Sequence, residues 1–217
     1  TNVGLGTTLP TDKLHVVGNI KIENGKIPFI NGSNSVYVGQ NAGNNDTFSV
    51  SLGNIAIGKD ALMTNSTSSG NTAVGFQALK NNTSNSNTAI GYNALRDNTT
   101  GSWNVSLGQN SLASNTTGRV NIGIGGQALL YNTTGRDNIA IGDSALLNNT
   151  SGIQNVAIGN IAGRSNIVGS RNVFLGFSAG FNETGNDKLY IDNTNTIDPL
   201  IYGDFATDLL KINGTLN

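Results

Sequence analysis

Hydrophobic and polar positions alternate in a five-residue segment that recurs along most of the chain. In 87-NTAIG-91, 121-NIGIG-125 and 138-NIAIG-142, a small residue stands between two β-branched residues, and Asn and Gly flank the three. Alternation with β-branched residues predicts a short β-strand. Because neighbouring side chains of a strand point to opposite faces, Ile122 and Ile124 share one face and Gly123 lies on the other.

The Gly that closes each segment marks the phase of a repeat. Successive markers follow at one constant step, except between Gly75 and Gly91, where the loop 80-KNNTSNS-86 is one residue shorter. The segment 35-SVYVG-39 is an earlier, irregular copy, and the step from its Gly39 to Gly58 is slightly longer. A fixed period of about 17 residues is typical of a solenoid in which each repeat forms one coil. The marker glycines are Gly58, Gly75, Gly91, Gly108, Gly125, Gly142, Gly159 and Gly176.

Two further motifs complete each repeat. An Ala-Leu pair follows the marker Gly, as in 94-AL-95 and 128-AL-129, and supplies a second apolar contact in each coil. The motif N-T-T-G comes next, as in 98-NTTG-101 and 132-NTTG-135. Asn and Gly tolerate a left-handed backbone and Thr hydroxyls bond nearby backbone groups, so this motif predicts a turn. We therefore expect each coil to contain a strand, a bend, a short second strand and a turn.

The Asn that opens each strand segment is expected to form a ladder along the stack. Stacked coils lie about 4.8 Å apart, so equivalent amide groups can hydrogen-bond to one another. About nine coils between Gly39 and Gly176 predict a rod roughly 40 Å long. The ladder residues are Asn104, Asn121, Asn138, Asn155 and Asn172.

The apolar residues of a coil exceed what its interior can hold. A coil this short encloses very little volume, so we expect other copies of the chain to cover the remainder. A closed ring of three copies would also protect the long repetitive flanks. The predicted fold is all-β: a parallel β-roll or β-solenoid of about nine 17-residue coils, assembled as an intertwined or side-by-side homotrimer. Residues 1–33 are expected to form a β-rich N-terminal module, 34–186 the solenoid, and 187–217 a β-rich exit segment that caps it.

Composition excludes several classes of site and partner. Cys is absent, which excludes disulfides and thiolate metal sites. A net charge of −1 argues against nucleic acid and against a polybasic membrane surface. The chain has no run of about 18 apolar residues, so we expect no membrane insertion within it.

The sequence offers little for catalysis. His15 is the only histidine, it lies in the strand pattern 13-KLHVVG-18, and a Ser-His-Asp set could be built only around it. No lysine follows the glycines of 123-GIGG-126 as a phosphate-binding loop requires, and no metal cluster is visible. We expect no catalytic residue, metal or cofactor. A polysaccharide-cleaving pair of carboxylates is the enzyme alternative, with candidates at the variable positions Asp97, Asp137, Asp143 and Asp187.

Two sets of variable residues are candidates for binding. Arg119 and Arg136 occupy position 11 after the marker Gly, and Trp103 and Arg171 occupy position 12, so a stack places them along one edge. Trp with Arg suits a sugar ring or an acidic glycan, whereas solvated turn residues are the alternative interpretation. The second set is a Thr array that raises the alternative of an ice-binding solenoid, although adjacent threonines of a strand point to opposite sides. Its pairs are Thr99/Thr100, Thr116/Thr117 and Thr133/Thr134.

Three stretches of the chain carry a resemblance to known families. The repeat in 87-NTAIGYNA-94, 138-NIAIGDSA-145 and 155-NVAIGNIA-162 resembles the head repeat of trimeric autotransporter adhesins, the YadA-like family, which implies a left-handed parallel β-roll assembled as a trimer. The start, 2-NVGLGTTLPTDKLHVVGNIKI-22, resembles short modules of phage tail fibres. The end, 188-KLYIDNTNTIDPLIYGDFATDLLKINGTLN-217, resembles the segment that often precedes a self-cleaving chaperone domain in such fibres.

These resemblances imply a biological role outside the cell. We expect a stiff trimeric segment of an extracellular or virion fibre that presents a surface to a cell-surface glycan or receptor. The head of a bacterial surface adhesin is the main alternative. A polysaccharide-cleaving tailspike and an ice-binding solenoid are the others.

Overall fold

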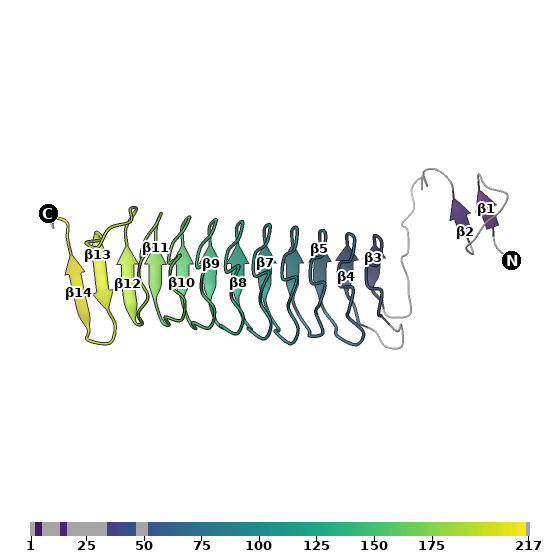
Figure 1. Cartoon of the computed structure of the whole chain (residues 1–217), viewed down its shortest axis with the longest axis horizontal. Coiled ribbons are helices and arrows are strands. Elements are labelled where there is room, and N and C mark those ends of the chain that lie inside the picture. The colour runs from purple at the N-terminus through teal and green to yellow at the C-terminus, as the bar shows by residue number, and fades with distance from the viewer. Residues whose placement is uncertain (1–2, 6–13, 17–33, 47–51, 216–217) are drawn as a thin grey trace.

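The described residues fold as stacked coils of β-structure. The computed structural model describes residues 3–5, 14–16, 34–46 and 52–215, and within these ranges every regular element is a strand (Figure 1). One strand of three residues lies in each coil, and three longer strands follow. The strands of the coils are β3 (Val36–Val38), β4 (Ile55–Ile57), β5 (Thr72–Val74), β6 (Thr88–Ile90), β7 (Val105–Leu107), β8 (Ile122–Ile124), β9 (Ile139–Ile141), β10 (Val156–Ile158) and β11 (Val173–Leu175). The later strands are β12 (Lys188–Ile191), β13 (Ile201–Asp204) and β14 (Leu209–Ile212).

These twelve strands form one sheet in chain order. From β3 to β12 each strand pairs in parallel with the next coil, so that Ile122 lies opposite Ile139 and Gly123 opposite Ala140. The predicted parallel β-solenoid of about nine coils is therefore confirmed. A separate parallel pair, β1 (Val3–Leu5) and β2 (Leu14–Val16), lies within the expected N-terminal module, with His15 opposite Gly4. The remaining residues of that module lie outside the described ranges.

The interior of the coils is narrow and lined by small side chains. The central residue of each strand faces inward, as do the Ala and Leu that follow the marker Gly, and in most coils all three are fully buried. In the coil that contains β9 these residues are Ala140, Ala145 and Leu146. The outer two residues of each strand are only partly buried or exposed, so the small face of the alternating pattern is the inner one.

The expected second strand of the coil is wrong. The Ala-Leu segment is a turn, and its Leu has a left-handed backbone, with φ of 53° at Leu129 and 49° at Leu146. The residue two places earlier is also left-handed, as at Gln127 with φ of 59°. A strand would alternate the directions of successive side chains, whereas this backbone lets both Ala and Leu point into the interior.

Two ladders of buried asparagines run along the stack. In the first, Asn121 lies next to the strand: its backbone N–H donates to Asn104 Oδ1 at 2.9 Å, and its side-chain amide donates to Gly135 O at 2.8 Å. In the second, Asn132 of the N-T-T-G turn donates to Asn115 Oδ1 at 2.7 Å. These amides satisfy buried polar groups without introducing any charge into the interior. The predicted ladder residues Asn104, Asn121, Asn138, Asn155 and Asn172 all lie in the first ladder and are fully buried.

Each marker Gly from Gly58 to Gly159 lies directly against the marker Gly of the next coil. Gly125 has φ of 129°, and a Cβ placed on it would lie 2.5 Å from the carbonyl oxygen of Gly142. Both the backbone conformation and the close approach therefore exclude a side chain at this position.

Aromatic residues replace the small interior residues at both ends of the solenoid. Phe174 occupies the central position of β11 and is fully buried, and Gly163 and Gly180 stand where other coils have Leu, which leaves room for its ring. At the other end Tyr37 occupies the central position of β3, with Gly43 at the Leu position. These aromatic rings thus fill the space that the leucine side chains fill in the other coils.

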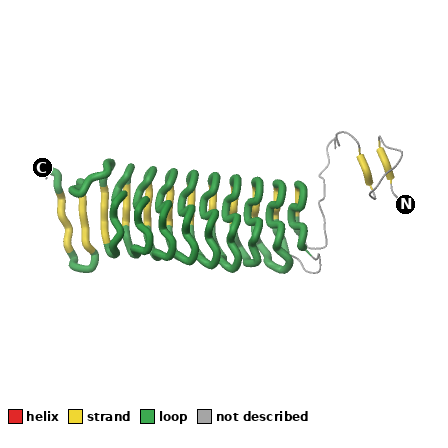
Figure 2. The backbone as a smooth tube through the Cα atoms, viewed as in Figure 1, coloured by secondary structure: helices red, strands yellow, loops and turns green. Residues whose placement is uncertain are grey.

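The exit segment ends the parallel stack. β12 is still parallel to β11, whereas β13 pairs antiparallel with β12 and β14 antiparallel with β13. Tyr190 and Tyr202 continue the inner column beyond Phe174, with ring centroids 5.9 and 5.3 Å apart in succession. In Figure 2 the strands stand on one side of the coils, and the loop segments run in front of them on the other.

Candidate functional site

The outer side of the sheet is an apolar surface. Because the central residue of each strand faces inward, the residues before and after it point outward. We call these two columns the outer sheet face. The first column is Val36, Ile55, Thr72, Thr88, Val105, Ile122, Ile139, Val156 and Val173, and the second is Val38, Ile57, Val74, Ile90, Leu107, Ile124, Ile141, Ile158 and Leu175. Only Thr72 and Thr88 are polar, and none of these residues is charged.

The outer sheet face is partly or fully exposed to solvent along its length. The side chains of Ile57, Leu107 and Ile158 are 40%, 44% and 42% exposed, which is unusual for large aliphatic residues arranged in register. Contiguous apolar surfaces of this kind mark interaction sites in soluble proteins. The sequence pattern alone indicated a surplus of apolar side chains, and the structure locates that surplus on one side of the solenoid.

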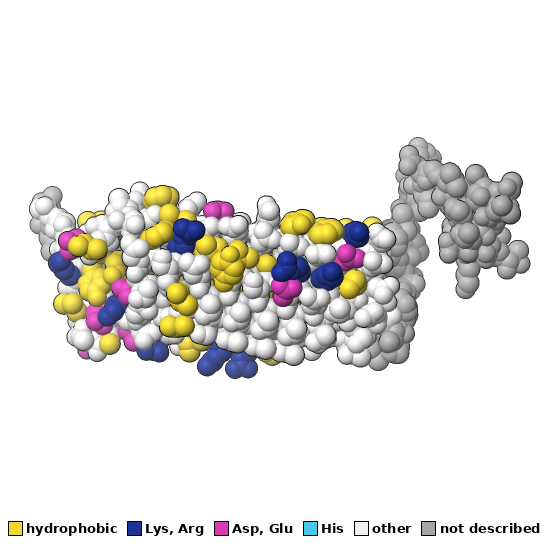
Figure 3. Space-filling view, in the orientation of Figure 1, with side chains coloured by type: hydrophobic (Ala, Val, Ile, Leu, Met, Phe, Trp, Pro, Cys, Tyr) yellow, Lys and Arg dark blue, Asp and Glu magenta, His cyan; other side chains and the backbone are white. Residues whose placement is uncertain are grey.

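The same surface continues into the exit segment, which does not follow the repeat. Leu189 lies opposite Val173, and Ile191 lies opposite Leu175. Ile201 and Ile212 then extend the second column through β13 and β14. The repeat coils and the exit segment, whose sequences differ, therefore form one continuous apolar surface. The loop side in Figure 3, by contrast, shows separate apolar and charged groups scattered among uncharged polar atoms.

The candidate glycan residues lie on successive turns of one edge. Trp103 is 61% exposed, and Arg119 and Arg136 follow on the next two coils. Backbone hydrogen bonds join this edge: Asp137 N–H donates to Arg119 O at 3.1 Å. Arg171 lies on the same edge, two coils beyond Arg136.

Two of the three arginines on this edge already have carboxylate partners. Arg171 donates through Nε and Nη2 to the two oxygens of Asp187, at 2.5 and 2.7 Å. This pairing raises the pKa of Arg171 and lowers the pKa of the Asp187 carboxyl. Arg136 lies 3.3 Å from Asp137. Among the described residues Arg119 has no ion pair, so it is the arginine most available to an anionic ligand.

The Thr array serves the stack as well as the surface. Thr116 Oγ1 donates to Thr133 O at 3.0 Å, and Thr133 Oγ1 donates to Thr150 O at 3.1 Å. The first Thr of each pair thus bonds to the backbone of the next coil. The second Thr, such as Thr117 or Thr134, is exposed.

The candidate carboxylates lie beside their own donors. Asp97 accepts from Arg96, Asp143 accepts from Ser144 at 3.1 Å, and Asp137 and Asp187 accept from the arginines named above. Within the part of the chain that the structure describes, no group of three or more His, Asp or Glu side chains could hold a metal ion. In that same part no helix is long and apolar enough to cross a bilayer.

The structure has a groove on the loop side that the sequence did not predict. Ser114, Tyr131, Thr133, Asn148, Thr150 and Ile167 line it, and we call it the Tyr131 groove. Tyr131 is 50% exposed and stands at position 6 after its marker Gly. The available signal was an exception to the repeat, because the other complete coils have a short polar residue at this position.

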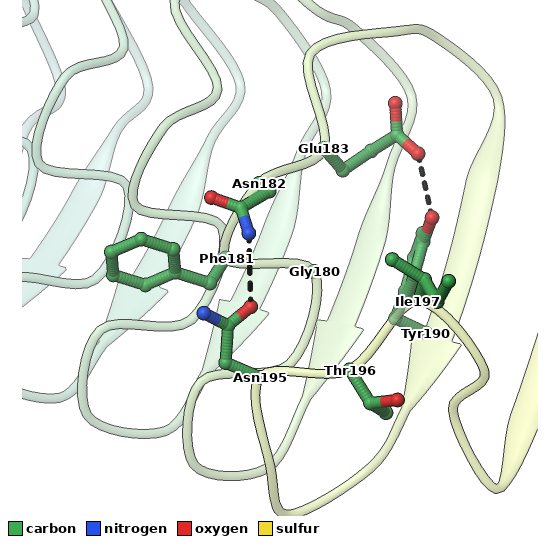
Figure 4. Close-up of a pocket in the computed structure, with 8 residues that line it drawn as sticks. All are labelled: Gly180, Phe181, Asn182, Glu183, Tyr190, Asn195, Thr196 and Ile197. Carbon is green, nitrogen blue, oxygen red and sulfur yellow. Dashed lines mark hydrogen bonds between the residues drawn. The ribbon is translucent and has the colours of Figure 1, made fainter.

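A second, smaller pocket of about 140 Å³ lies where the repeat ends (Figure 4). Its polar groups are paired with one another: Tyr190 Oη donates to Glu183 Oε2 at 2.8 Å, and Asn182 Nδ2 donates to Asn195 Oδ1 at 3.2 Å. Burial, followed by the hydrogen bond to Glu183, raises the pKa of Tyr190. These pairings close the open end of the interior and leave few groups for a ligand.

Comparisons with protein-family models, with curated proteins and with solved structures found no match for this chain. Its classification therefore rests on the coils, the ladders and the parallel sheet described above. The chain is a β-solenoid repeat protein.

Proposed function

We propose that this chain is a non-enzymatic segment of an extracellular or virion fibre, in which three copies pack through their outer sheet faces. The assembly would act as a stiff spacer and present a surface to a cell or glycan. The observation that carries the proposal is the outer sheet face, which is uncharged, apolar except at Thr72 and Thr88, and extended by the outward residues of β12 to β14.

Burial of this face explains why the repeat keeps large aliphatic residues there. Apolar area contributes roughly 25 cal/mol per Å² when it is removed from water. Each coil adds one or two such side chains, so the gain grows with every repeat. A ring in which identical faces meet around an axis covers all of them and leaves no copy with an open face.

The number three is supported by the resemblance of the repeat to the heads of YadA-like trimeric adhesins. The flanking stretches 2–22 and 188–217 resemble parts of phage tail fibres, which supports a fibre over an adhesin head. The gene sequence beyond Asn217 would separate the two: a self-cleaving chaperone domain favours a fibre, and a membrane anchor favours an adhesin.

Attachment is assigned to the edge that carries Trp103 and Arg119, which lies on turns outside the sheet. A trimer would present this edge three times, so weak single contacts would gain by multivalency. The expected partner is a cell-surface glycan with acidic groups, with Trp103 stacking on a sugar ring and Arg119, Arg136 and Arg171 facing the acid.

The test is attachment of the labelled chain to a panel of bacterial and animal cells. We expect Trp103→Ala combined with Arg136→Ala to weaken attachment while mass and circular dichroism stay unchanged, and Arg119→Ala to weaken it more than Arg136→Ala. Unchanged attachment of a folded double variant would remove this edge from the proposal. Release of fragments from capsular polysaccharide would instead indicate an enzyme.

A further inference from the structure

We propose that the Tyr131 groove binds an uncharged saccharide unit, as a receptor site distinct from the edge of Trp103. The inference rests on the proposed attachment function and assigns a second ligand class to it. It starts from two departures from the repeat that meet in one groove, Tyr131 and Ile167.

Neither departure is required by the packing of the coils. Tyr131 keeps the backbone hydrogen bond of its position, from its N–H to Leu147 O at 3.1 Å, so only the side chain differs from the other coils. Ile167 replaces the Thr that most coils have at position 8, and its carbonyl still accepts from Thr150 Oγ1 at 3.1 Å. Both side chains are 50% exposed. Their size therefore serves the surface and not the interior.

The groove combines an apolar ring with neighbouring polar side chains that are available for hydrogen bonds. The ring of Tyr131 is flanked by Ser114 on the preceding coil and Asn148 on the next. Neither of these two side chains has a hydrogen-bond partner in the described part of the chain. The hydroxyl groups of Thr133 and Thr150 donate to backbone carbonyls, so their oxygens remain available as hydrogen-bond acceptors.

This arrangement matches one face and one edge of a sugar. The apolar C–H face of a hexose stacks on an aromatic ring, while its hydroxyl groups need donors and acceptors beside that ring. None of the six lining residues is charged, so the groove fits a neutral saccharide better than an acidic one. Its volume of about 520 Å³ is within the range of small-molecule sites.

The groove stays open when the outer sheet face is covered. The interior lies between the strand on one side and the Ala-Leu turn on the other, since a Cβ on Gly123 would contact both Leu112 and Ala128. Positions 6 and 8, which line the groove, follow that turn and face outward on the loop side. A trimer would therefore present three such grooves to solvent.

The test is an array of immobilised oligosaccharides, neutral and acidic, probed with the labelled full chain. The strongest neutral binder is then titrated against Tyr131→Ala, Tyr131→Phe, Asn148→Ala and, as a matched control, Tyr92→Ala, because Tyr92 is also 50% exposed but lies outside the groove. We expect Tyr131→Ala to lose about tenfold in affinity, Tyr131→Phe and Tyr92→Ala to stay within about threefold of wild type, and Asn148→Ala to fall between.

Retention of no neutral oligosaccharide by the wild-type chain would overturn the inference, and so would equal affinities of Tyr131→Ala and wild type. Cell attachment of the same variants separates this failure from that of the proposed function. Cells that bind wild type and Tyr131→Ala equally would reject the groove and leave the attachment function standing. If the chain binds neutral glycan through the groove but attaches to no cell, the groove is supported and the attachment function is rejected.

Discussion

At the residue scale, the marker glycines are the positions where the repeat tolerates least change. Gly125 combines φ of 129° with a neighbouring carbonyl 2.5 Å from any Cβ. The same geometry recurs at Gly108 and Gly142, so the carbonyl that blocks each position belongs to the next marker. A side chain there would separate two coils that share a parallel ladder.

We predict that Gly125→Val lowers stability by about 3 kcal/mol or more, because strain and a backbone clash add. Asp143→Ser is the control, since Asp143 is exposed and directly follows another marker. Thermal melting of the two variants checks the prediction. Equal melting temperatures would refute the role assigned to the marker position.

Phe174 shows how single residues end the repeat. Its ring fills the interior where Gly163 and Gly180 remove the usual leucines. We predict that Phe174→Ala costs about 3–5 kcal/mol, because the cavity cannot be filled by neighbouring glycines. Phe177→Ala should cost less than about 0.5 kcal/mol, since Phe177 is 50% exposed. Chemical denaturation of both variants gives the comparison, and similar midpoints would count against a packed interior at this end.

At the scale of the element, the asparagine ladders hold the coils in register. Asn121 Oδ1 accepts from the backbone N–H of Asn138 at 3.1 Å, and its amide donates to Gly135 O. Because the next coil repeats these bonds, a shift by one residue would leave buried groups of both coils without partners.

We predict that Asn121→Ala destabilises the fold by about 1–3 kcal/mol, because it leaves the buried N–H of Asn138 without a partner and removes one of the two amide donors to Gly135 O. Asn160→Ala is the matched control: Asn160 is exposed, and its side chain has no hydrogen bond within the described residues. Denaturant midpoints of the two variants check this. A loss that is equally small in both would show that the ladder contributes little.

The exit segment depends on charges that the interior ladders lack. Hydrogen bonds from Arg171 and Lys188 lower the pKa of Asp187 and Asp204. A carboxyl whose folded pKa is lowered stabilises the fold above its unfolded pKa of about 4, and this contribution is lost as the pH falls through the folded pKa.

We therefore predict that residues 188–212 lose protection from hydrogen exchange below about pH 4, whereas coils 104–176 keep theirs. Protection factors at pH 3 and pH 6 test the difference, and Asp204→Asn should reproduce part of the loss at pH 6. Equal retention in both regions at pH 3 would contradict the assignment.

The sequence predicted the elements better than their faces. Alternation and spacing gave the strands, the coils and the ladder, because each depends on local residue types that recur in phase. For the Ala-Leu pair the residue types predict a strand, since nothing in the residue type of Leu129 indicates a left-handed backbone. Tertiary packing imposes that conformation so that Leu129 reaches the interior. Tyr131 was missed for a related reason: its meaning depends on neighbours one coil away, Ser114 and Asn148.

At the scale of the whole molecule, the chain has two apolar regions, a buried interior and an exposed outer sheet face. The interior is complete within one chain, because Ala, Leu and the Asn ladders fill it. The outer sheet face is not covered by the chain itself, since residues such as Leu107 and Ile158 remain exposed. This exposed apolar surface grows with each coil of the stack, so we expect other copies of the chain to cover it.

The most direct test is the mass of the folded chain in solution, measured by light scattering at micromolar concentration. We predict a trimer of about 67 kDa, three times the chain mass of 22.4 kDa. We also expect Ile124→Glu with Ile141→Glu, two charges on the outer sheet face, to prevent assembly, whereas Thr117→Glu on the exposed turn should not. A stable, folded wild-type monomer of 22.4 kDa would show that the outer sheet face needs no cover from other copies.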